Sequence, residues 1–145
     1  MSAEQPQNVV RTMIEAFNAR QFDALAATIV SPNLVYTQNG NTGDRNKWLQ
    51  DFRNCAVSFP DVHLTIKSQE VVEDQVITDL VITGTHLGPL GEIPPTGKSF
   101  SVDIHLTCRV KDGIMLDWIE QVDQMSMARQ LGLIPDEVTD TIDNR

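Results

Sequence analysis

A long alternating segment near the C-terminal end of the chain limits what the protein can fold into. From Lys98 to Val110, apolar residues take every second position and polar residues fill most of the positions between them. Alternation with a period of two over this length is typical of a β-strand with one buried face. Asp112-Gly113 follows and supplies the positive φ angles that a tight hairpin needs. The chain is therefore predicted to return as a second strand from Ile114 to about Val122.

The first half of the chain instead shows the three- and four-residue spacing of amphipathic helices. Three helices are predicted there, at residues 4–19, 22–29 and 45–59. Ser31-Pro32-Asn33 ends the second helix, because proline cannot continue a helix, and Asp44 is placed to cap the third. A short strand at 34–37 and a turn cluster at 39–43 are predicted between the second and third helices.

In the middle of the chain the period of the apolar residues changes to two. Strands are predicted at 62–67 and 76–86, with a turn at Asp74-Gln75. A loop rich in Gly and Pro, 87–97, leads into the long hairpin. A short helix is predicted after the hairpin, opened by Asp123 and ended at Gly132.

Helices followed by a run of antiparallel strands predict an α+β fold. The expected form is a cone-shaped α+β barrel, in which a curved, mostly antiparallel sheet is closed by the N-terminal helices. A cone of this kind encloses a pocket, and such pockets bind small apolar ligands. The length predicts a single domain over residues 1–145, with 136–145 as a flexible acidic tail.

The composition narrows the classes of partner. The formal net charge of −9 argues against nucleic acid and against an anionic membrane, because phosphate binding needs clustered Lys and Arg. No apolar run reaches membrane-spanning length and no secretory signal is present, so a cytoplasmic protein is expected. Cys55 and Cys108 are expected to be free, buried thiols. With no phosphate-binding loop and no Cys/His cluster at metal spacing, neither a cofactor nor a metal is expected.

Several short motifs occur in the order and spacing of a known family. They are Gly84-Thr85-His86, Ile93-Pro94-Pro95-Thr96-Gly97, Arg109-Val110-Lys111-Asp112-Gly113, Asp123 and Gln130-Leu131-Gly132. Together with Ala16-Phe17-Asn18 and Phe59-Pro60-Asp61, they make the chain resemble the SnoaL-like polyketide cyclases from about Val9 to Gly132. These belong to the wider group similar to nuclear transport factor 2 and ketosteroid isomerase. The family includes cyclases that close a ring by intramolecular aldol condensation without a cofactor, and also hydroxylase-like members.

The resemblance implies a general acid/base late in the last strand. Counting from the Asp-Gly turn, that position falls on Glu120, where the cyclases usually carry Asp. Their pocket histidine falls on Leu106, and this chain has His105 next to it. One residue along a strand separates the inner face from the outer face. Either a bulge turns His105 inward, or the protein lacks the pocket histidine.

The residues themselves also indicate Glu120. Leu116, Trp118 and Glu120 are predicted to share one face of the last strand. A carboxylate beside tryptophan on an inward face would be desolvated, which raises its pKa and lets it exchange protons near neutral pH. The alternative is a solvated Glu120 at the strand end. Asp123 also has two interpretations, as the N-cap of the following helix or as part of the chemistry.

The candidate substrate-binding residues come from several elements. Trp48 and Phe52 lie one turn apart on the third predicted helix, where the wall of the core would also be the wall of the pocket. Trp118 and Leu106 are expected to face inward from the last two strands. His86 precedes the loop rich in Gly and Pro and is expected at the pocket mouth.

These observations predict a cofactor-independent acid/base enzyme of the cyclase or isomerase type, acting on an apolar, carbonyl-bearing small molecule. Glu120 is the expected base, with Asp123 and His105 as further catalytic candidates. Two alternatives stay open: a binding protein without turnover, and an epoxide hydrolase or dehydratase in the same pocket. Apolar or β-branched residues on both faces of the strands, such as Val71 and Val81, predict a homodimer, or a tetramer built on dimers, paired through the sheet.

Overall fold

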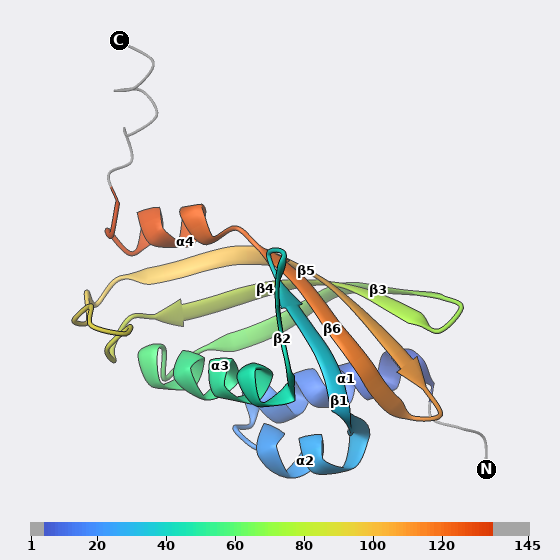
Figure 1. The fold of residues 1–145 in the computed structure, drawn as a ribbon. Helices are drawn as coiled ribbons and strands as arrows, with labels where there is room; N and C mark the ends of the chain where they lie inside the picture. Colours follow the sequence, from blue (N-terminus) through green and yellow to red (C-terminus); the bar gives the residue numbers. More distant parts are fainter. Residues whose placement is uncertain (1–4, 135–145) are drawn as a thin grey trace.

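The protein is described by a computed structural model, which covers residues 5–134 (Figure 1). The predicted acidic tail at 136–145 lies outside the described residues. The elements follow in the order α1 (Pro6–Asn18), α2 (Phe22–Ile29), β1 (Val30–Gln38), β2 (Asn41–Gly43), α3 (Arg45–Ser58), β3 (His63–Val72), β4 (Gln75–Thr85), β5 (Ser99–Lys111), β6 (Ile114–Val122) and α4 (Gln124–Gln130). None of the helices in this part of the chain is long and apolar enough to cross a membrane.

The strands form one curved sheet with helices on one face. Their order is β2-β1-β6-β5-β4-β3, and only the β1–β6 pair among the described strands is parallel. Figure 1 shows α1, α2 and α3 together along one face of the sheet, whereas α4 lies apart from them near β5. The predicted α+β fold, with a mostly antiparallel sheet closed by the N-terminal helices, is confirmed.

The first strand is longer than the prediction of 34–37. β1 begins at Val30, directly after α2, and continues to Gln38. Pro32 lies inside this strand although it has no N–H to donate. The pairing with β6 changes register between Val30 and Val35, and proline is tolerated in a strand at such irregularities.

Two turns also differ from the prediction. The cluster at 39–43 is a hairpin rather than a simple turn, since Asn39 and Gly40 take φ angles of 49° and 87° and the chain returns as β2. Between β3 and β4 the turn consists of Glu73-Asp74, because Gln75 already pairs with Val72.

The β5–β6 hairpin confirms the alternation but contains one irregularity. Asp112 and Gly113 take φ angles of 54° and 78°, as the tight turn requires. Beyond the turn the register of β5 and β6 shifts by one residue. As a result Met115 is fully buried and Leu116 only half-buried, whereas Trp118 and Glu120 are buried as expected. The prediction that Leu116 shares their face is therefore wrong.

Aromatic rings join the helices to the sheet. The ring of Phe52 on α3 lies 4.8 Å from that of Phe17 on α1, between centroids, and 5.4 Å from that of Trp118 on β6. Phe22 of α2 lies 5.3 Å from the same Phe52 ring. Such pairs contribute about 0.5–1.5 kcal/mol each beyond the burial of their area. The cluster therefore fixes the three helices over the concave face of the sheet.

Asp123 is the N-cap of α4, as one of its two interpretations predicted. Its Oδ1 accepts a hydrogen bond from the backbone N–H of Ser126 at 2.9 Å. We expect Asp123→Ala to lower the free energy of unfolding by about 0.5–2 kcal/mol, because an N–H of the first turn loses its acceptor. Urea unfolding measures this, with Asp123→Asn as the control that keeps a capping oxygen. Unchanged stability in Asp123→Ala would contradict the capping role.

The outer face of the sheet keeps exposed apolar side chains. Val35 on β1 and Ile119 on β6 are 48% and 40% exposed, and Val72 on β3, opposite Gln75, is 45% exposed. The homodimer through the sheet stays a prediction. We expect sedimentation velocity at micromolar concentration to give a dimer, and Ile119→Lys to shift it toward monomer, because a charge would have to be buried in the contact. A wild-type monomer would contradict this prediction.

Candidate active site

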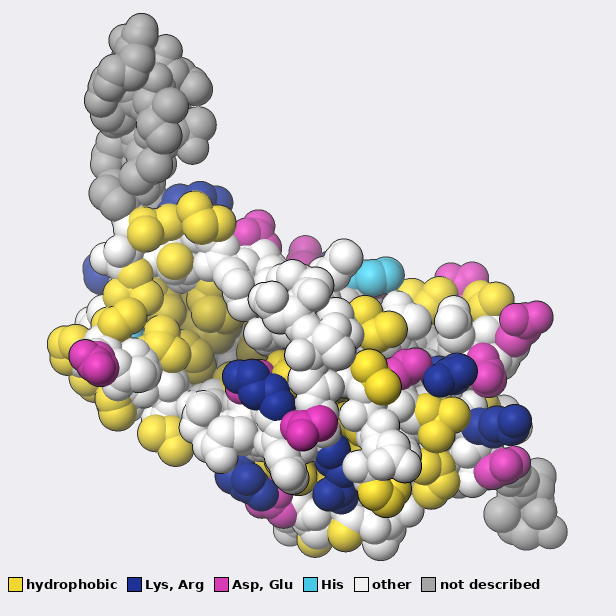
Figure 2. All heavy atoms as spheres, in the orientation of Figure 1, with side chains coloured by type: hydrophobic (Ala, Val, Ile, Leu, Met, Phe, Trp, Pro, Cys, Tyr) yellow, Lys and Arg dark blue, Asp and Glu magenta, His cyan; other side chains and the backbone are white. Residues whose placement is uncertain are grey.

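A cavity of about 180 Å³ lies between the sheet and the helices. Most of its wall is apolar, with side chains from three helices and five strands, among them Phe17, Phe52, Leu80, Ile104, Trp118 and Met127. Figure 2 shows a hollow lined with hydrophobic side chains between α4 and α3. The cavity suits a small, largely apolar molecule, or the apolar part of a larger one.

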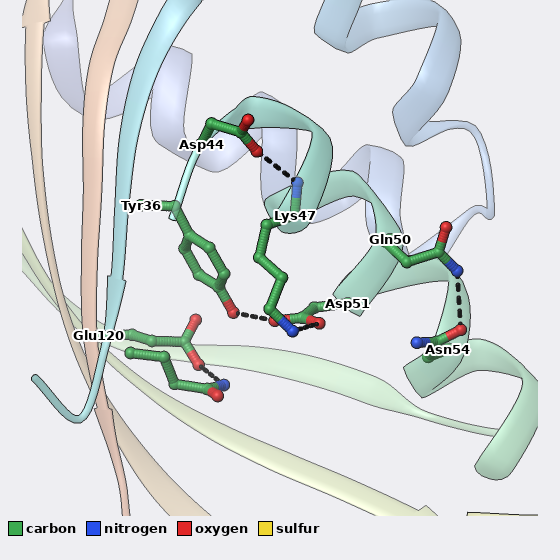
Figure 3. A network of polar contacts seen from close by, with 8 residues as sticks. Tyr36, Asp44, Lys47, Gln50, Asp51, Asn54 and Glu120 are labelled. Atoms are coloured by element: carbon green, nitrogen blue, oxygen red, sulfur yellow. Dashed lines mark hydrogen bonds and ion pairs between the residues drawn. The ribbon is translucent and has the colours of Figure 1, made fainter. Parts of the chain in front are cut away.

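Polar side chains gather at one end of this cavity. Tyr36 and Gln38 reach it from β1, Asp51 from α3 and Glu120 from β6. The parallel register of β1 and β6 places Gln38 opposite Glu120. Figure 3 shows the Tyr36 hydroxyl pointing toward Asp51, with Glu120 close by. Three strand residues and one helix residue thus form a polar end in an otherwise apolar cavity.

The Glu120 carboxyl group is buried and held by two neutral donors. Its Oε1 accepts from the Trp118 indole N–H at 2.7 Å, and its Oε2 accepts from the Gln38 amide at 2.8 Å. Among residues 5–134, no Lys or Arg lines the cavity. Burial raises the pKa of Glu120 above its ordinary value. The hydrogen bonds from Gln38 and Trp118 lower this pKa in part, and the negative charge of nearby Asp51 raises it further. Glu120 faces the cavity as predicted, and it binds a proton more tightly than an exposed glutamate.

A second carboxylate lies at the same end. The Tyr36 hydroxyl donates to Asp51 Oδ2 at 2.7 Å, and Lys47 Nζ, one helical turn before Asp51, contacts Oδ1 at 2.9 Å. Tyr36 is only 3% exposed, and burial together with the charges of Glu120 and Asp51 raises its pKa well above the ordinary range. Tyr36 is therefore a neutral phenol whose hydroxyl hydrogen is held by Asp51.

The two cysteines are free thiols, as predicted. Cys108 is fully buried, whereas Cys55 is only half-buried and lines the cavity. Burial raises the pKa of Cys55 to about 12, so it stays a thiol at neutral pH and is a poor nucleophile. In the described part of the chain, no three His, Cys, Asp or Glu side chains come together in a group that could hold a metal ion.

The structure brings three of the predicted site residues together in the cavity wall, namely Glu120, Trp118 and Phe52. Trp48 lies behind them, fully buried, with its ring 4.9 Å from Phe52 and 5.5 Å from Trp118. Leu106 pairs directly with Glu120 across β5 and β6 but is also fully buried and does not line the cavity. Both residues support the wall rather than form it.

The three other predicted site residues lie outside the cavity. His105 is on the outer face of the sheet, with its Nδ1 2.8 Å from Asp79 Oδ1, so the inward bulge is wrong. Asp123 is an exposed helix cap. His86 is fully buried away from the mouth, where its Nδ1 accepts from the backbone N–H of Thr96 at 3.2 Å. It anchors the loop that returns to β5.

Sequence reasoning missed Tyr36, Gln38 and Asp51. A signal existed for two of them. Tyr36 follows Val35 in the predicted strand, so the two side chains point to opposite faces of the sheet. Asp51 lies on the same helical face as Trp48 and Cys55 and therefore points in the same direction as they do. Gln38 lies one residue beyond the predicted end of that strand, so its inward direction had no support.

The burial of Glu120 predicts a pH-dependent stability. The pKa of Glu120 in the folded state lies above the unfolded value of about 4.3. Its stabilising contribution to the folded state is therefore fully present below the unfolded pKa, and it is lost as the pH rises through the folded-state pKa. Gln does not titrate, so we expect the Tm of Glu120→Gln to rise relative to wild type between about pH 4 and about pH 8. Thermal unfolding across this range measures the difference, with Glu70→Gln on exposed β3 as the control. A difference that stays constant or falls would contradict the buried, proton-holding Glu120.

Solved structures with the same fold come from several bacteria. AclR, a candidate hydroxylase from Streptomyces galilaeus, is 23% identical over 92% of this chain and 100% of its own, with a TM-score of 0.82. IdmH, a candidate polyketide cyclase from Streptomyces antibioticus, is 27% identical over 89% of this chain and 99% of its own, with a TM-score of 0.80. A candidate SnoaL-like polyketide cyclase from Jannaschia sp. CCS1 is 15% identical over 92% and 95%, with a TM-score of 0.81.

No curated protein matches the chain by sequence. The family description does match, because the profile of the SnoaL-like polyketide cyclases covers residues 7–131. Apart from Pro6, the first residue of α1, this range contains all the helices and strands of the described residues and every residue of the polar end of the cavity. The resemblance seen in the sequence is therefore confirmed: the chain belongs to the SnoaL-like polyketide cyclase family and has its fold, that of nuclear transport factor 2.

Proposed function

We propose that the protein is a cofactor-independent acid/base enzyme that moves a proton next to a carbonyl group in an apolar small molecule. The observation that carries this proposal is Glu120, a buried carboxyl group held by Trp118 and Gln38 and, among residues 5–134, by no cation. Membership in the family supports the class of reaction, since IdmH is a candidate polyketide cyclase. An isomerase or a ring-closing cyclase uses the same first step.

In that step, ionised Glu120 takes a proton from the carbon beside the carbonyl group. The C–H electron pair moves into a C=C bond and the carbonyl oxygen becomes an enolate. Return of the proton from Glu120 to another carbon gives an isomer. Alternatively, the enolate carbon attacks a second carbonyl group in the same molecule, and the proton from Glu120 converts the new alkoxide into a hydroxyl group. Both sequences balance without an oxidant or a reductant.

The surroundings of Glu120 suit this work because they permit both of its protonation states. Neutral donors stabilise the carboxylate less than a Lys or Arg would, so burial keeps the pKa raised. A general base acts best when its pKa lies near the working pH, and such a group contributes about 10²–10⁴-fold to the rate. The apolar wall excludes water from the reacting atoms, which strengthens their interaction with the carboxylate.

A simple carbon acid tests the proposal without knowledge of the natural substrate. We expect the wild-type protein to accelerate exchange of the protons beside the carbonyl of 1-tetralone with deuterium in D₂O, followed by NMR. Glu120→Gln keeps the shape of the side chain but cannot accept the proton, so its rate above background should fall by about 10²–10⁴-fold. Glu70→Gln, the same change at an exposed position of β3, should exchange like wild type.

Two results would contradict the proposal. One is full exchange activity in Glu120→Gln. The other is a wild-type protein that binds 1-tetralone and does not accelerate exchange. In the second case the cavity is better described as the site of a small-molecule binding protein.

A further inference from the structure

Asp51 is a carboxylate in the cavity wall that the proposed reaction does not use. It lies half-buried on α3 and is contacted from two sides, by the hydroxyl of Tyr36 and by the ammonium group of Lys47. Lys47 is 61% exposed and does not line the cavity, so the ion pair sits at the edge of the site. Asp51 therefore faces the cavity itself and also acts on it through Tyr36.

The contact with Asp51 decides how Tyr36 meets a ligand. A hydroxyl group has one hydrogen to donate and two lone pairs that accept. The hydrogen of Tyr36 is committed to Asp51 Oδ2 at 2.7 Å, as Figure 3 shows. What Tyr36 has left for the cavity is an acceptor oxygen.

The other donors at the polar end are largely committed as well. The Trp118 indole N–H and one N–H of the Gln38 amide are bonded to Glu120. The second Gln38 N–H and the Cys55 thiol, a weak donor, remain there, and the Gln124 amide lies at the exposed mouth. When Glu120 is ionised, as proton abstraction requires, the lone pairs of two carboxylates and of Tyr36 stand against these donors, with no Lys or Arg in the wall formed by the described residues. The polar end mainly accepts hydrogen bonds.

We propose that Asp51 is a positioning residue that sets this polarity, and that the site selects neutral substrates with a hydroxyl group that donates to Tyr36. This deepens the proposed function and rests on it: the hydroxyl group anchors the substrate at Tyr36 while the carbon acid meets Glu120. A ligand that offers only acceptors leaves these oxygens without a hydrogen, and a carboxylate ligand is repelled by Asp51 and Glu120.

The substitution Asp51→Asn should invert the polarity of Tyr36, and Lys47 makes the direction of the new amide predictable. In wild type, Lys47 contacts Asp51 Oδ1 and Tyr36 donates to Oδ2. In Asp51→Asn, the ammonium group of Lys47 favours the amide oxygen on its own side, so the amide nitrogen takes the place of Oδ2. The Asn N–H then donates to the Tyr36 oxygen, and the Tyr36 hydrogen is released toward the cavity. Asp44→Asn is the matched control, since it removes the same charge from the start of the same helix and Asn caps as well as Asp.

The experiment compares two probes of nearly the same size, 1-tetralol, which donates, and 1-tetralone, which only accepts. Isothermal titration calorimetry gives the Kd of each. We expect wild type and Asp44→Asn to bind the alcohol about tenfold more tightly than the ketone, and Asp51→Asn to lose or reverse this preference. Tyr36→Phe should also lose it, and provides a second variant if Asp51→Asn does not fold.

Several results would overturn the inference. They are a wild-type preference for the ketone, no detectable binding of the alcohol, or equal effects of Asp51→Asn and Asp44→Asn on the ratio of the two Kd values. The measurement is at equilibrium and involves no turnover, so it is separate from the test of Glu120. A preserved alcohol preference with no proton exchange would reject the proposed enzyme and keep the role of Asp51. Exchange without the preference would do the reverse.

Discussion

The parallel pairing of β1 with β6 is the contact on which the site depends. In this register Tyr36 lies opposite Trp118 and Gln38 opposite Glu120, so one alignment places all four side chains on the concave face. A slip by one residue would turn Tyr36 and Gln38 to the outer face and leave Glu120 with one donor instead of two. The irregularity beside Pro32 occurs earlier in β1, before these two residues. The rest of the strand therefore holds the register that the site needs.

Glu120 is stabilised in a way that keeps it able to exchange its proton. A buried carboxylate beside a Lys or Arg would be fixed in its ionised form, because the opposite charge lowers the pKa. Here the partners are an indole and an amide, and desolvation is the largest effect on the group. The aromatic cluster around Phe52 contributes to that burial, since Phe52 and Trp118 pack together in the wall of the cavity that Glu120 faces. The same packing thus holds the fold together and sets the acid/base behaviour of Glu120.

Much of the fold and one central part of the site could be predicted from the sequence, because they depend on local periodicity. The spacing of neighbouring residues predicts the long hairpin, the three N-terminal helices and the Asp123 cap. It also predicts the inward direction of Glu120. The alternation of side chains along a strand predicts their direction only as far as the next irregularity in the pairing. The pairing of β6 with β5 contains a register shift, and for this reason the prediction for Leu116 was wrong. The pair of Tyr36 and Asp51 joins a strand to a helix, and no pattern within one element shows which of its neighbours across the cavity a side chain will meet.

The departure from the resembled cyclases explains why burial has so large a part in tuning Glu120. At the position where the resemblance implies a pocket histidine, this chain has Leu106, fully buried and directly opposite Glu120, while His105 is paired with Asp79 on the outer face. A protonated histidine beside Glu120 would favour the carboxylate and lower its pKa, whereas leucine adds only desolvation. The negative charge of Asp51 acts in the same direction as that desolvation. A leucine at this position is therefore compatible with acid/base chemistry, provided that one carboxyl group both takes and returns the proton.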